Sequence, residues 1–483
     1  MQNGSESVGV PALRRSLGTL DLVLLNVAVI VGLRWLSTAA QSGPSGLSLW
    51  VIACLVFFVP SGLAVQELSS RIPHEGGLYV WTRAAFGDTH GFLAGWAYSL
   101  SNLVFFPSLL LFISGVFLHI IGGSWVSLAE SPIYNGLVCL GLLWATTFLN
   151  ILGLKRAKWL QNIGGISNIV VGVLVLGGGA AAWWQFGSAT PIGITNLAPD
   201  LGSLSSLSTL AILILAYSGL ELGPIFGDEI KGSSRTIQRA IVIAGIVSAI
   251  IYVAGTAALL VALPPQQISA ISGIPQSMEA IGQRAGIVGF GTMAAVMLTL
   301  ATIGGLGAWI SGAARLPFVM GLGHYLPERL GAIHPKYGSP YIALLVQAAL
   351  ASVVLLAAIS GSAIREAYLL LIDMTVALNS LVWMYIFASL AILRRRATGG
   401  NVGVSLIPGG PWVCWLLAGV GLLATAFATI VSLVPPAGGA NPVLFLFKGV
   451  GGCLLLLTAG FVICRRGRKR AFGAQVAVKP AKA

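Results

Sequence analysis

The residues best placed to do chemistry in this sequence are charged side chains set inside long apolar runs. Residues 17–46 form one such run, in which Arg34 follows Gly32 and Leu33. An arginine within a bilayer costs a few kcal/mol even on lenient insertion scales, so its side chain should face protein or a water-filled cavity. Irregular backbone is tolerated there under the same condition. We therefore expect a helix interrupted near Gly32 to Arg34, whose free N–H and C=O groups hold part of a small zwitterion.

Arg34 also has a simpler interpretation. It lies 17 residues after Leu17, which is about 25 Å along a straight helix that rises ~1.5 Å per residue. Its long side chain could therefore extend to the outer membrane interface. The sequence leaves both positions open, and we favour the cavity.

A second run, residues 206–229, repeats this combination of features. Glu221 lies near its middle, and Pro224 removes a backbone hydrogen bond and clashes with the preceding turn, so the helix should break or kink nearby, at about Ser218 to Leu222. At this depth Glu221 must pair with a cation or stay protonated. Each interrupted run begins a set of five apolar spans, which is typical of inverted-repeat transporters whose site lies between the interruptions.

The composition predicts a helical membrane protein. Of the 483 residues, 56% are hydrophobic and only 8% are charged, whereas about a quarter of a soluble protein is charged. Apolar runs of about 20 residues recur along the chain, longer than the roughly 10-residue strands of a membrane barrel. We expect an all-α fold with twelve transmembrane helices, at residues 17–41, 46–70, 89–122, 132–152, 162–185, 206–229, 237–263, 286–314, 341–360, 364–392, 411–434 and 442–464.

The basic residues predict how these spans are oriented. With both termini cytoplasmic, all but four of the 27 lysines and arginines fall in cytoplasmic segments, the four being Arg34, Arg284, Arg365 and Lys448. Short loops rich in these residues stay inside, so we expect both termini on the inner side of a plasma membrane. The net charge of +13 follows from this topology, so the expected partner is a lipid bilayer and not nucleic acid.

The chain should divide into four segments. A cytoplasmic tail precedes a transporter core of ten helices in two repeats, and two peripheral helices and a basic cytoplasmic tail follow. The corresponding residues are 1–16, 17–393 with repeats at about 17–185 and 206–392, 411–464, and 465–483.

Motifs for catalysis and metal binding are missing from the sequence. It contains no His-Glu-x-x-His, Gly-x-Ser-x-Gly or Gly-x-x-x-x-Gly-Lys-Ser/Thr pattern, and its five histidines are scattered. The five cysteines lie in or beside apolar runs without paired spacing, so neither disulfides nor a metal site is expected. We therefore expect neither an enzyme nor an ATP-driven pump, and no cofactor.

Four stretches together carry a family resemblance. They are residues 17–32, 64–96, 216–240 and 313–340. In this order and with this number of spans, the chain resembles the amino acid–polyamine–organocation superfamily of secondary transporters over residues 17–393. The resemblance implies the leucine-transporter fold, with five plus five inverted helices, two peripheral helices and alternating access by a rocking bundle.

The resemblance also implies how a substrate carboxylate is bound. Family members usually carry Gly-Ser/Ala/Thr-Gly in the first interruption, where backbone amides hold the carboxylate. The matching residues here are Gly32, Leu33 and Arg34. Arg34 could therefore clamp the carboxylate through a bidentate pair, or it could instead satisfy Glu221.

The second interruption is expected to bind the substrate ammonium. Tyr217, Ser218 and Gly219 match the family's aromatic-small-glycine run, in which carbonyl groups accept the ammonium and the aromatic ring closes over it. On a helix outside this family such a tyrosine would more often be a packing residue.

Five further residues are candidates for coupling or gating: Glu67, Asp228, Glu229, Asp373 and Thr302. Glu67 is favoured as a structural gate or cap. The resemblance implies an inner gate for Asp228 and Glu229, which on their own read as a solvated helix end. Asp373 could handle a proton or the substrate. The Thr302 hydroxyl could line a sodium site, although hydroxyls in membrane helices more often bond their own backbone, so coupling to H⁺ or Na⁺ stays open.

These patterns predict a secondary transporter. We expect its substrate to be an amino acid, carried by ion symport or exchange, with a polyamine or another organic cation as the alternative. The oligomeric state is left open by the sequence.

Overall fold

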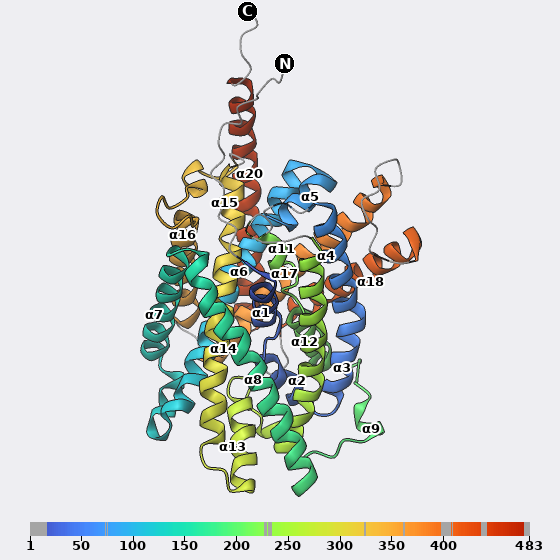
Figure 1. Ribbon diagram of the computed structural model, residues 1–483, viewed down its shortest axis with the longest axis vertical. Helices are drawn as coiled ribbons and strands as arrows, with labels where there is room; N and C mark the ends of the chain where they lie inside the picture. The colour runs from blue at the N-terminus through green and yellow to red at the C-terminus, as the bar shows by residue number, and fades with distance from the viewer. Residues whose placement is uncertain are drawn as a thin grey trace, which may run out of the picture.

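The computed structural model describes residues 17–72, 74, 76–226, 229, 234–322, 325–360, 363–397, 407, 409–435 and 442–477. All regular elements within these ranges are helices, and eleven helical segments are long and apolar enough to cross a membrane. Figure 1 shows them packed into one elongated bundle, in which the short helices α5 (Leu78–Phe86) and α15 (Arg315–Leu322) lie at one end and α9 (Ile194–Leu197) and α13 (Gly273–Ala285) at the other. We call these the α5 end and the α13 end.

The spans follow the predicted order along the chain. Their helices are α1 (Thr19–Ile30), α2 (Arg34–Gln41), α3 (Ser45–Ala53), α4 (Val59–Arg71), α6 (Asp88–Ile121), α7 (Pro132–Ile151), α8 (Leu154–Phe186), α10 (Leu204–Ala216), α11 (Leu222–Ile225), α12 (Ser234–Ala262), α14 (Phe290–Ala313), α16 (Tyr341–Ile359), α17 (Ile364–Ala397), α18 (Gly410–Ser432), α19 (Pro442–Phe445) and α20 (Gly452–Ala477).

Eleven of the twelve predicted spans correspond to these long segments. The sixth, predicted at residues 206–229, is interrupted: α10 ends at Ala216, residues 217–221 are not helical, and α11 lasts only four residues. The predicted interruption is therefore confirmed. The sequence did not indicate a π-helical turn at Cys54–Phe58 in the second span, or α13 between the seventh and eighth spans.

Small residues bring the central helices close together. The helix α14 packs along α8 and α6, and α1 packs against α8 and α12. A Cβ atom built on Gly304 of α14 would lie 2.3 Å from the Cα atom of Gly164 on α8, and one built on Gly165 would lie 2.5 Å from the carbonyl oxygen of Leu24. Such close backbone approach is how membrane helices pack without a hydrophobic drive between them.

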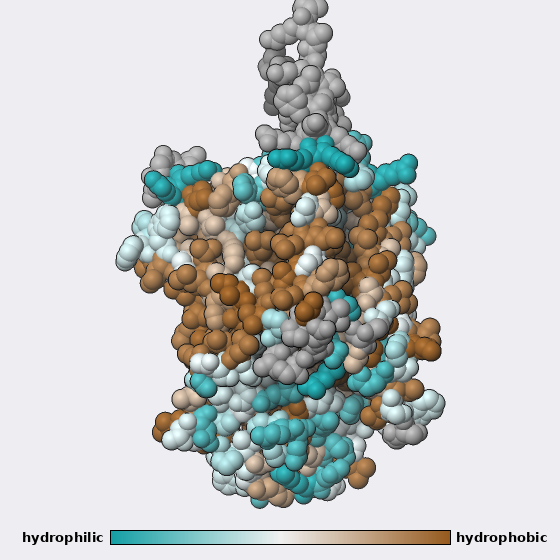
Figure 2. Space-filling view, turned by 180° about the vertical axis from the view of Figure 1, so that it is seen from behind, coloured by the Kyte–Doolittle hydropathy of each residue, from teal (hydrophilic) through white to brown (hydrophobic). Residues whose placement is uncertain are grey.

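The outer surface suits a lipid environment. Figure 2 shows, on one face, a broad apolar belt with hydrophilic residues gathered toward the two ends. Large apolar side chains are exposed on the spanning helices, such as Val173 on α8 (64%), Val353 on α16 (65%) and Leu423 on α18 (70%). A soluble protein rarely exposes so much contiguous apolar surface. The chain is a polytopic membrane protein.

Candidate functional site

The first break separates α1 from α2. The helix α1 ends at Ile30, residues 31–33 leave the helical path, and α2 begins at Arg34. Gly32 is required here, because a Cβ atom at this position would lie 2.6 Å from the indole ring of Trp35. The predicted interruption is confirmed, with the difference that Arg34 already belongs to the second helix.

The second break follows α10. Gly219 has φ of +118°, a backbone conformation that L side chains rarely adopt, and a Cβ atom built on it would lie 2.8 Å from Cγ1 of Val29. Its N–H donates a hydrogen bond of 2.8 Å to Oε2 of Glu221, two residues further on. The second break therefore packs against the last turn of α1, and the two breaks face each other across one cavity, as predicted.

One tyrosine joins the two breaks. The hydroxyl of Tyr252 on α12 accepts a hydrogen bond from the N–H of Gly32 (3.0 Å). The same hydroxyl lies within donating distance of the carbonyl oxygens of Ile30 (2.5 Å) and Ala216 (2.9 Å). Tyr252 is fully buried. Sequence reasoning missed it, because a tyrosine on an apolar helix carries no signal that distinguishes it from a packing residue.

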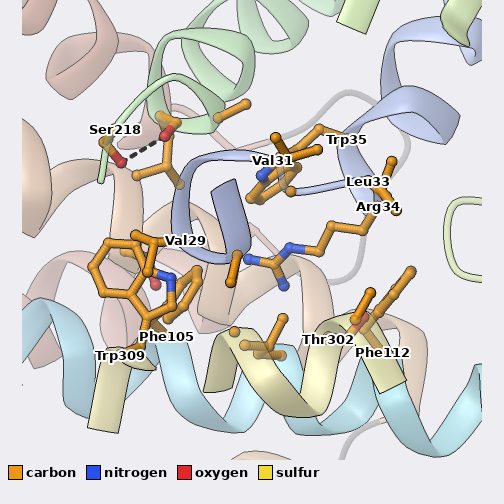
Figure 3. A pocket seen from close by; sticks show the side chains of 18 of the residues that line it. Val29, Val31, Leu33, Arg34, Trp35, Phe105, Phe112, Ser218, Thr302 and Trp309 are labelled. Atoms are coloured by element: carbon orange, nitrogen blue, oxygen red, sulfur yellow. Dashed lines mark hydrogen bonds between the residues drawn. The ribbon is translucent and has the colours of Figure 1, made fainter. Parts of the chain in front are cut away.

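A cavity of about 50 Å³ lies between the breaks. This space holds a few waters, so the structure shows the site closed down. Six of the predicted residues line it: Val31, Gly32, Leu33, Arg34, Ser218 and Thr302. Figure 3 shows the Arg34 side chain extending across the pocket, with Trp35 on one side and Thr302 and Phe112 on the other.

Arg34 is held by aromatic rings without a carboxylate. Its guanidinium carbon lies 4.1 Å from the centroid of the Trp35 ring and 4.9 Å from that of Phe105. Its Nη1 donates to Oγ of Ser108 at 3.3 Å, and its Nη2 is buried without a hydrogen-bond partner. Arg34 is only 3% exposed. The prediction that this side chain enters the cavity is confirmed.

Glu221 does not balance this charge. In the described part of the chain Arg34 and Glu221 form no ion pair, and Glu221 is not among the residues that line the cavity. Its Oε2 is used by the Gly219 N–H and its Oε1 is buried without a partner. The proposed Arg34–Glu221 pair is therefore wrong for this conformation, because the carboxylate folds back onto its own break.

Tyr217 does not lie on the cavity wall either. Its ring is fully buried among Trp50 (5.2 Å, edge-on), Phe58 (4.5 Å, stacked) and Tyr252 (5.1 Å, edge-on). The predicted aromatic gate at Tyr217 is wrong, because the chain turns at Ser218 and only the serine side of the break faces the cavity. Gly219 is also absent from the cavity lining.

Other aromatic side chains form the part of the cavity wall where Tyr217 was expected. Trp309 on α14 lines the cavity together with Phe105 and Trp35, and in Figure 3 Trp309 lies with Phe105 at the end opposite Leu33. Thr302, Gly305 and Trp309 are spaced three and four residues apart, which places them on one helix face. This spacing was readable in the sequence once Thr302 had been singled out.

Three asparagines add polar groups to the lining: Asn102 on α6, Asn168 on α8 and Asn379 on α17. The Oδ1 atoms of Asn102 and Asn379 are buried without partners. Thr302 donates to the carbonyl oxygen of Leu298 at 2.7 Å, the backbone bond expected of a hydroxyl in a membrane helix. Among the described residues no group of three or more His, Cys, Asp or Glu side chains could hold a metal ion.

Buried ion pairs close the α5 end of the bundle. Glu229 pairs with Arg315 at 2.5 Å, with both side chains 3% exposed. Arg315 lies 4.1 Å over the Phe226 ring, and the carbonyl oxygen of Glu229 accepts a hydrogen bond from the N–H of Leu17, just before α1. Asp228, the other predicted gating acid, lies outside the described residues.

Glu67 is the centre of a second network. Its Oε1 accepts from Arg71 on the next turn of α4 and from Arg394 on α17, and its Oε2 accepts from the N–H of Ile407 at 3.1 Å. Glu67 is completely buried. This position agrees with the structural cap that the sequence favoured, and Glu67 is not part of the cavity lining.

Asp373 and Asp21 lie away from the cavity lining as well. Asp373, on α17, is partly buried, and Asp21 bonds Lys158 (2.9 Å), Asn162 (2.9 Å) and the N–H of Gly18 (3.0 Å) near the start of α1. Asp21 therefore anchors the first helix to α8.

A second cavity of about 500 Å³ lies at the α13 end. Its lining includes Gln41, His119, Glu130, Arg365 and Tyr368. Tyr368 on α17 is 1% exposed, and its hydroxyl interacts electrostatically with the Arg34 guanidinium. This tyrosine therefore lies between the larger cavity and the site around Arg34.

Comparison with known proteins gives a consistent set of matches. Residues 17–457 match a family model described as amino acid permease. An uncharacterised transporter of Legionella pneumophila is 28% identical over 461 residues, 94% of this chain and 97% of the relative. A branched-chain amino acid permease of Bacillus subtilis is 25% identical, over 69% of this chain and 73% of its own. A probable agmatine/putrescine antiporter of Lactococcus lactis is 25% identical, over 65% and 64%.

Proposed function

Because the chain belongs to the amino acid permease family, we propose that it is a secondary active transporter that moves amino acids across the plasma membrane by alternating access. The observation that carries the proposal is the pair of backbone breaks, one after Ile30 and one after Ala216, that face a single polar cavity. Free backbone groups at broken helices bind small solutes without a dedicated charged pocket. Transport explains this arrangement without the catalytic groups that an intramembrane enzyme would need.

We assign the architecture from the positions of the same two breaks and from the family. The interrupted spans are the first and the sixth, so the core of residues 17–393 divides into repeats at about 17–185 and 206–392, with residues 411–464 as two peripheral helices. This arrangement agrees with the family, and it makes α1 and α10 the moving half-helices on either side of the site.

The direction of opening follows from the two ends of the bundle. We assign the α5 end to the cytoplasm, because short cytoplasmic loops are rich in lysine and arginine. The Glu229–Arg315 pair closes that end, whereas the cavity at the α13 end is separated from Arg34 by the Tyr368 ring. The conformation is therefore closed to the cytoplasm, and its larger cavity lies on the outer side of the site around Arg34.

The test is uptake of radiolabelled substrates into proteoliposomes. A panel of neutral, acidic and basic amino acids and putrescine is offered with a Na⁺ gradient, with a pH gradient, or with unlabelled substrate inside, and protein-free liposomes serve as the control. We expect saturable uptake of at least one amino acid. Uptake of putrescine alone would support the polyamine alternative, and no uptake of any compound would contradict the proposal.

A further inference from the structure

The charge balance of the central cavity is unusual for a site that binds a zwitterion. Arg34 is the one charged side chain among the described residues that line it, and no carboxylate is among them. Arg34 is 3% exposed and cannot lose its proton. The protein therefore presents its substrate with a fixed positive charge that no described residue of the cavity wall neutralises.

The guanidinium is also arranged to receive a ligand. The Trp35 and Phe105 rings lie near its carbon, and Ser108 takes one N–H of Nη1. Its Nη2 makes no close hydrogen bond, and the Tyr368 hydroxyl is the further polar group that interacts with the guanidinium. A planar guanidinium with free N–H groups matches the two oxygens of a carboxylate, and such charged pairs are about twice as strong as neutral hydrogen bonds.

The carbonyl groups at the ends of the two broken helices already share one hydrogen-bond donor. The carbonyl oxygens of Ile30 and Ala216, at the ends of the two broken helices, both lie at hydrogen-bonding distance from the Tyr252 hydroxyl. Among the described residues of the wall, the buried side-chain acceptors without a partner are the neutral amide oxygens of Asn102 and Asn379. They can receive an amino group but cannot compensate its charge.

From these three observations we infer that the transported substrate is a small acidic amino acid with a net charge of −1, whose carboxylate pairs with Arg34. The inference rests on the proposed function and narrows it. With a neutral amino acid bound, the net charge of the cavity remains +1, and a bound polyamine would raise it further. An acidic amino acid brings the sum of the charges to zero.

Glutamate and glutamine provide a matched test, because they have the same length and differ in charge. Binding of each to the purified protein is measured by calorimetry, and each is offered as a competitor for uptake in proteoliposomes. We expect glutamate, or aspartate against asparagine, to bind about 10- to 100-fold more tightly than its amide, the range for hydrogen bonds to a charged group.

Variants at Arg34 identify the origin of the preference. Arg34→Gln should reduce the preference for glutamate over glutamine to within about threefold. Arg34→Lys keeps the positive charge but loses the paired N–H donors of the guanidinium, so it should retain part of the preference. Arg284→Gln, on the exposed surface of α13, is the control and should leave it unchanged. Thermal unfolding of each variant reports whether it is folded.

Two results would overturn the inference. One is a wild-type protein that prefers the amide or binds both equally, which needs no variant and leaves the proposed transport of amino acids intact. The other is a folded Arg34→Gln protein that keeps the acidic preference. Failure to bind or transport any amino acid would instead remove the proposed function and the inference with it.

Discussion

At the scale of single residues, Tyr252 and Tyr217 provide a matched comparison. Both are fully buried in the same aromatic cluster, with ring centroids 5.1 Å apart. The Tyr252 hydroxyl bonds both broken helices, whereas the Tyr217 hydroxyl makes no hydrogen bond to either of them. Equal burial with unequal hydrogen bonding separates the role of the hydroxyl from that of the ring.

We expect Tyr252→Phe to lower the transport rate about tenfold or more, because buried backbone groups at both breaks lose a partner at a cost of about 1–3 kcal/mol each. Tyr217→Phe should transport like the parent protein. Initial uptake rates, normalised to protein in the membrane, measure both. Equal rates for the two phenylalanine variants would show that the bridge between the breaks is dispensable.

Tyr217→Ala has a different expected outcome from the one a cavity gate would give. Truncating a large buried aromatic ring typically costs about 3–5 kcal/mol, so the thermal unfolding temperature should fall while the Michaelis constant of the surviving protein changes little. A stable Tyr217→Ala protein with a greatly raised Michaelis constant would contradict this prediction and would show that the ring belongs to the substrate site.

The sequence allowed Arg34 to be placed in the cavity because a permanent charge inside an apolar run has few other destinations. It did not allow the partner to be named. Glu221 folds back onto Gly219 through a bond that depends on the φ of the glycine, and such a local turn is not encoded in spacing. Tyr217 was misplaced because a family match fixes a position along the chain and not the direction in which the side chain points.

At the scale of elements, Glu67 joins α4 to α17 and to the segment at Ile407. We expect Glu67→Gln to destabilise the protein by about 3–5 kcal/mol, because the buried Arg394 and the largely buried Arg71 lose their counterion. Asp88→Asn is the control: its pair with Arg83 is about half exposed, and such surface pairs are worth about 0–1 kcal/mol. Thermal unfolding in detergent compares the two. Equal, small shifts would mean that the network is not structural.

The contact between α8 and α14 gives a second prediction at this scale. Gly304→Leu should abolish folding or lower the unfolding temperature sharply, because even a Cβ atom there would overlap the Gly164 backbone. Gly177→Leu should be tolerated, because Gly177 lies on the same helix as Gly164 but a Cβ atom built on it would meet no neighbouring atom within 4 Å. Comparable unfolding temperatures for the two variants would contradict this packing.

Spanning helices were predictable because apolar length is a strong signal, and the interrupted spans because Gly32 and Pro224 lie where continuous helices would carry apolar, helix-forming residues. The π-helical turn at Cys54–Phe58 was not predictable, because nothing in an apolar run distinguishes that geometry from an α-helix. The helix α13 was missed because it is short and polar, and lies between spans.

At the scale of the whole molecule, we expect the solute to bind between the two breaks. A cavity of about 50 Å³ is smaller than an amino acid needs, so the helices around it must move apart during each cycle. A reagent should therefore reach the site only when the helices have moved apart, and a substrate bound in the open site should block the reagent.

Alkylation of Ser218→Cys, in a protein whose five native cysteines are replaced by alanine, tests this claim most directly. Ser218 lines the cavity and is 7% exposed. We expect the transported substrate to slow its reaction with N-ethylmaleimide several-fold, with half-protection near the Michaelis constant, and to leave Ser360→Cys, which is exposed beyond α16, unaffected. An unchanged Ser218→Cys labelling rate at saturating substrate, in protein that still transports, would contradict a site between the breaks.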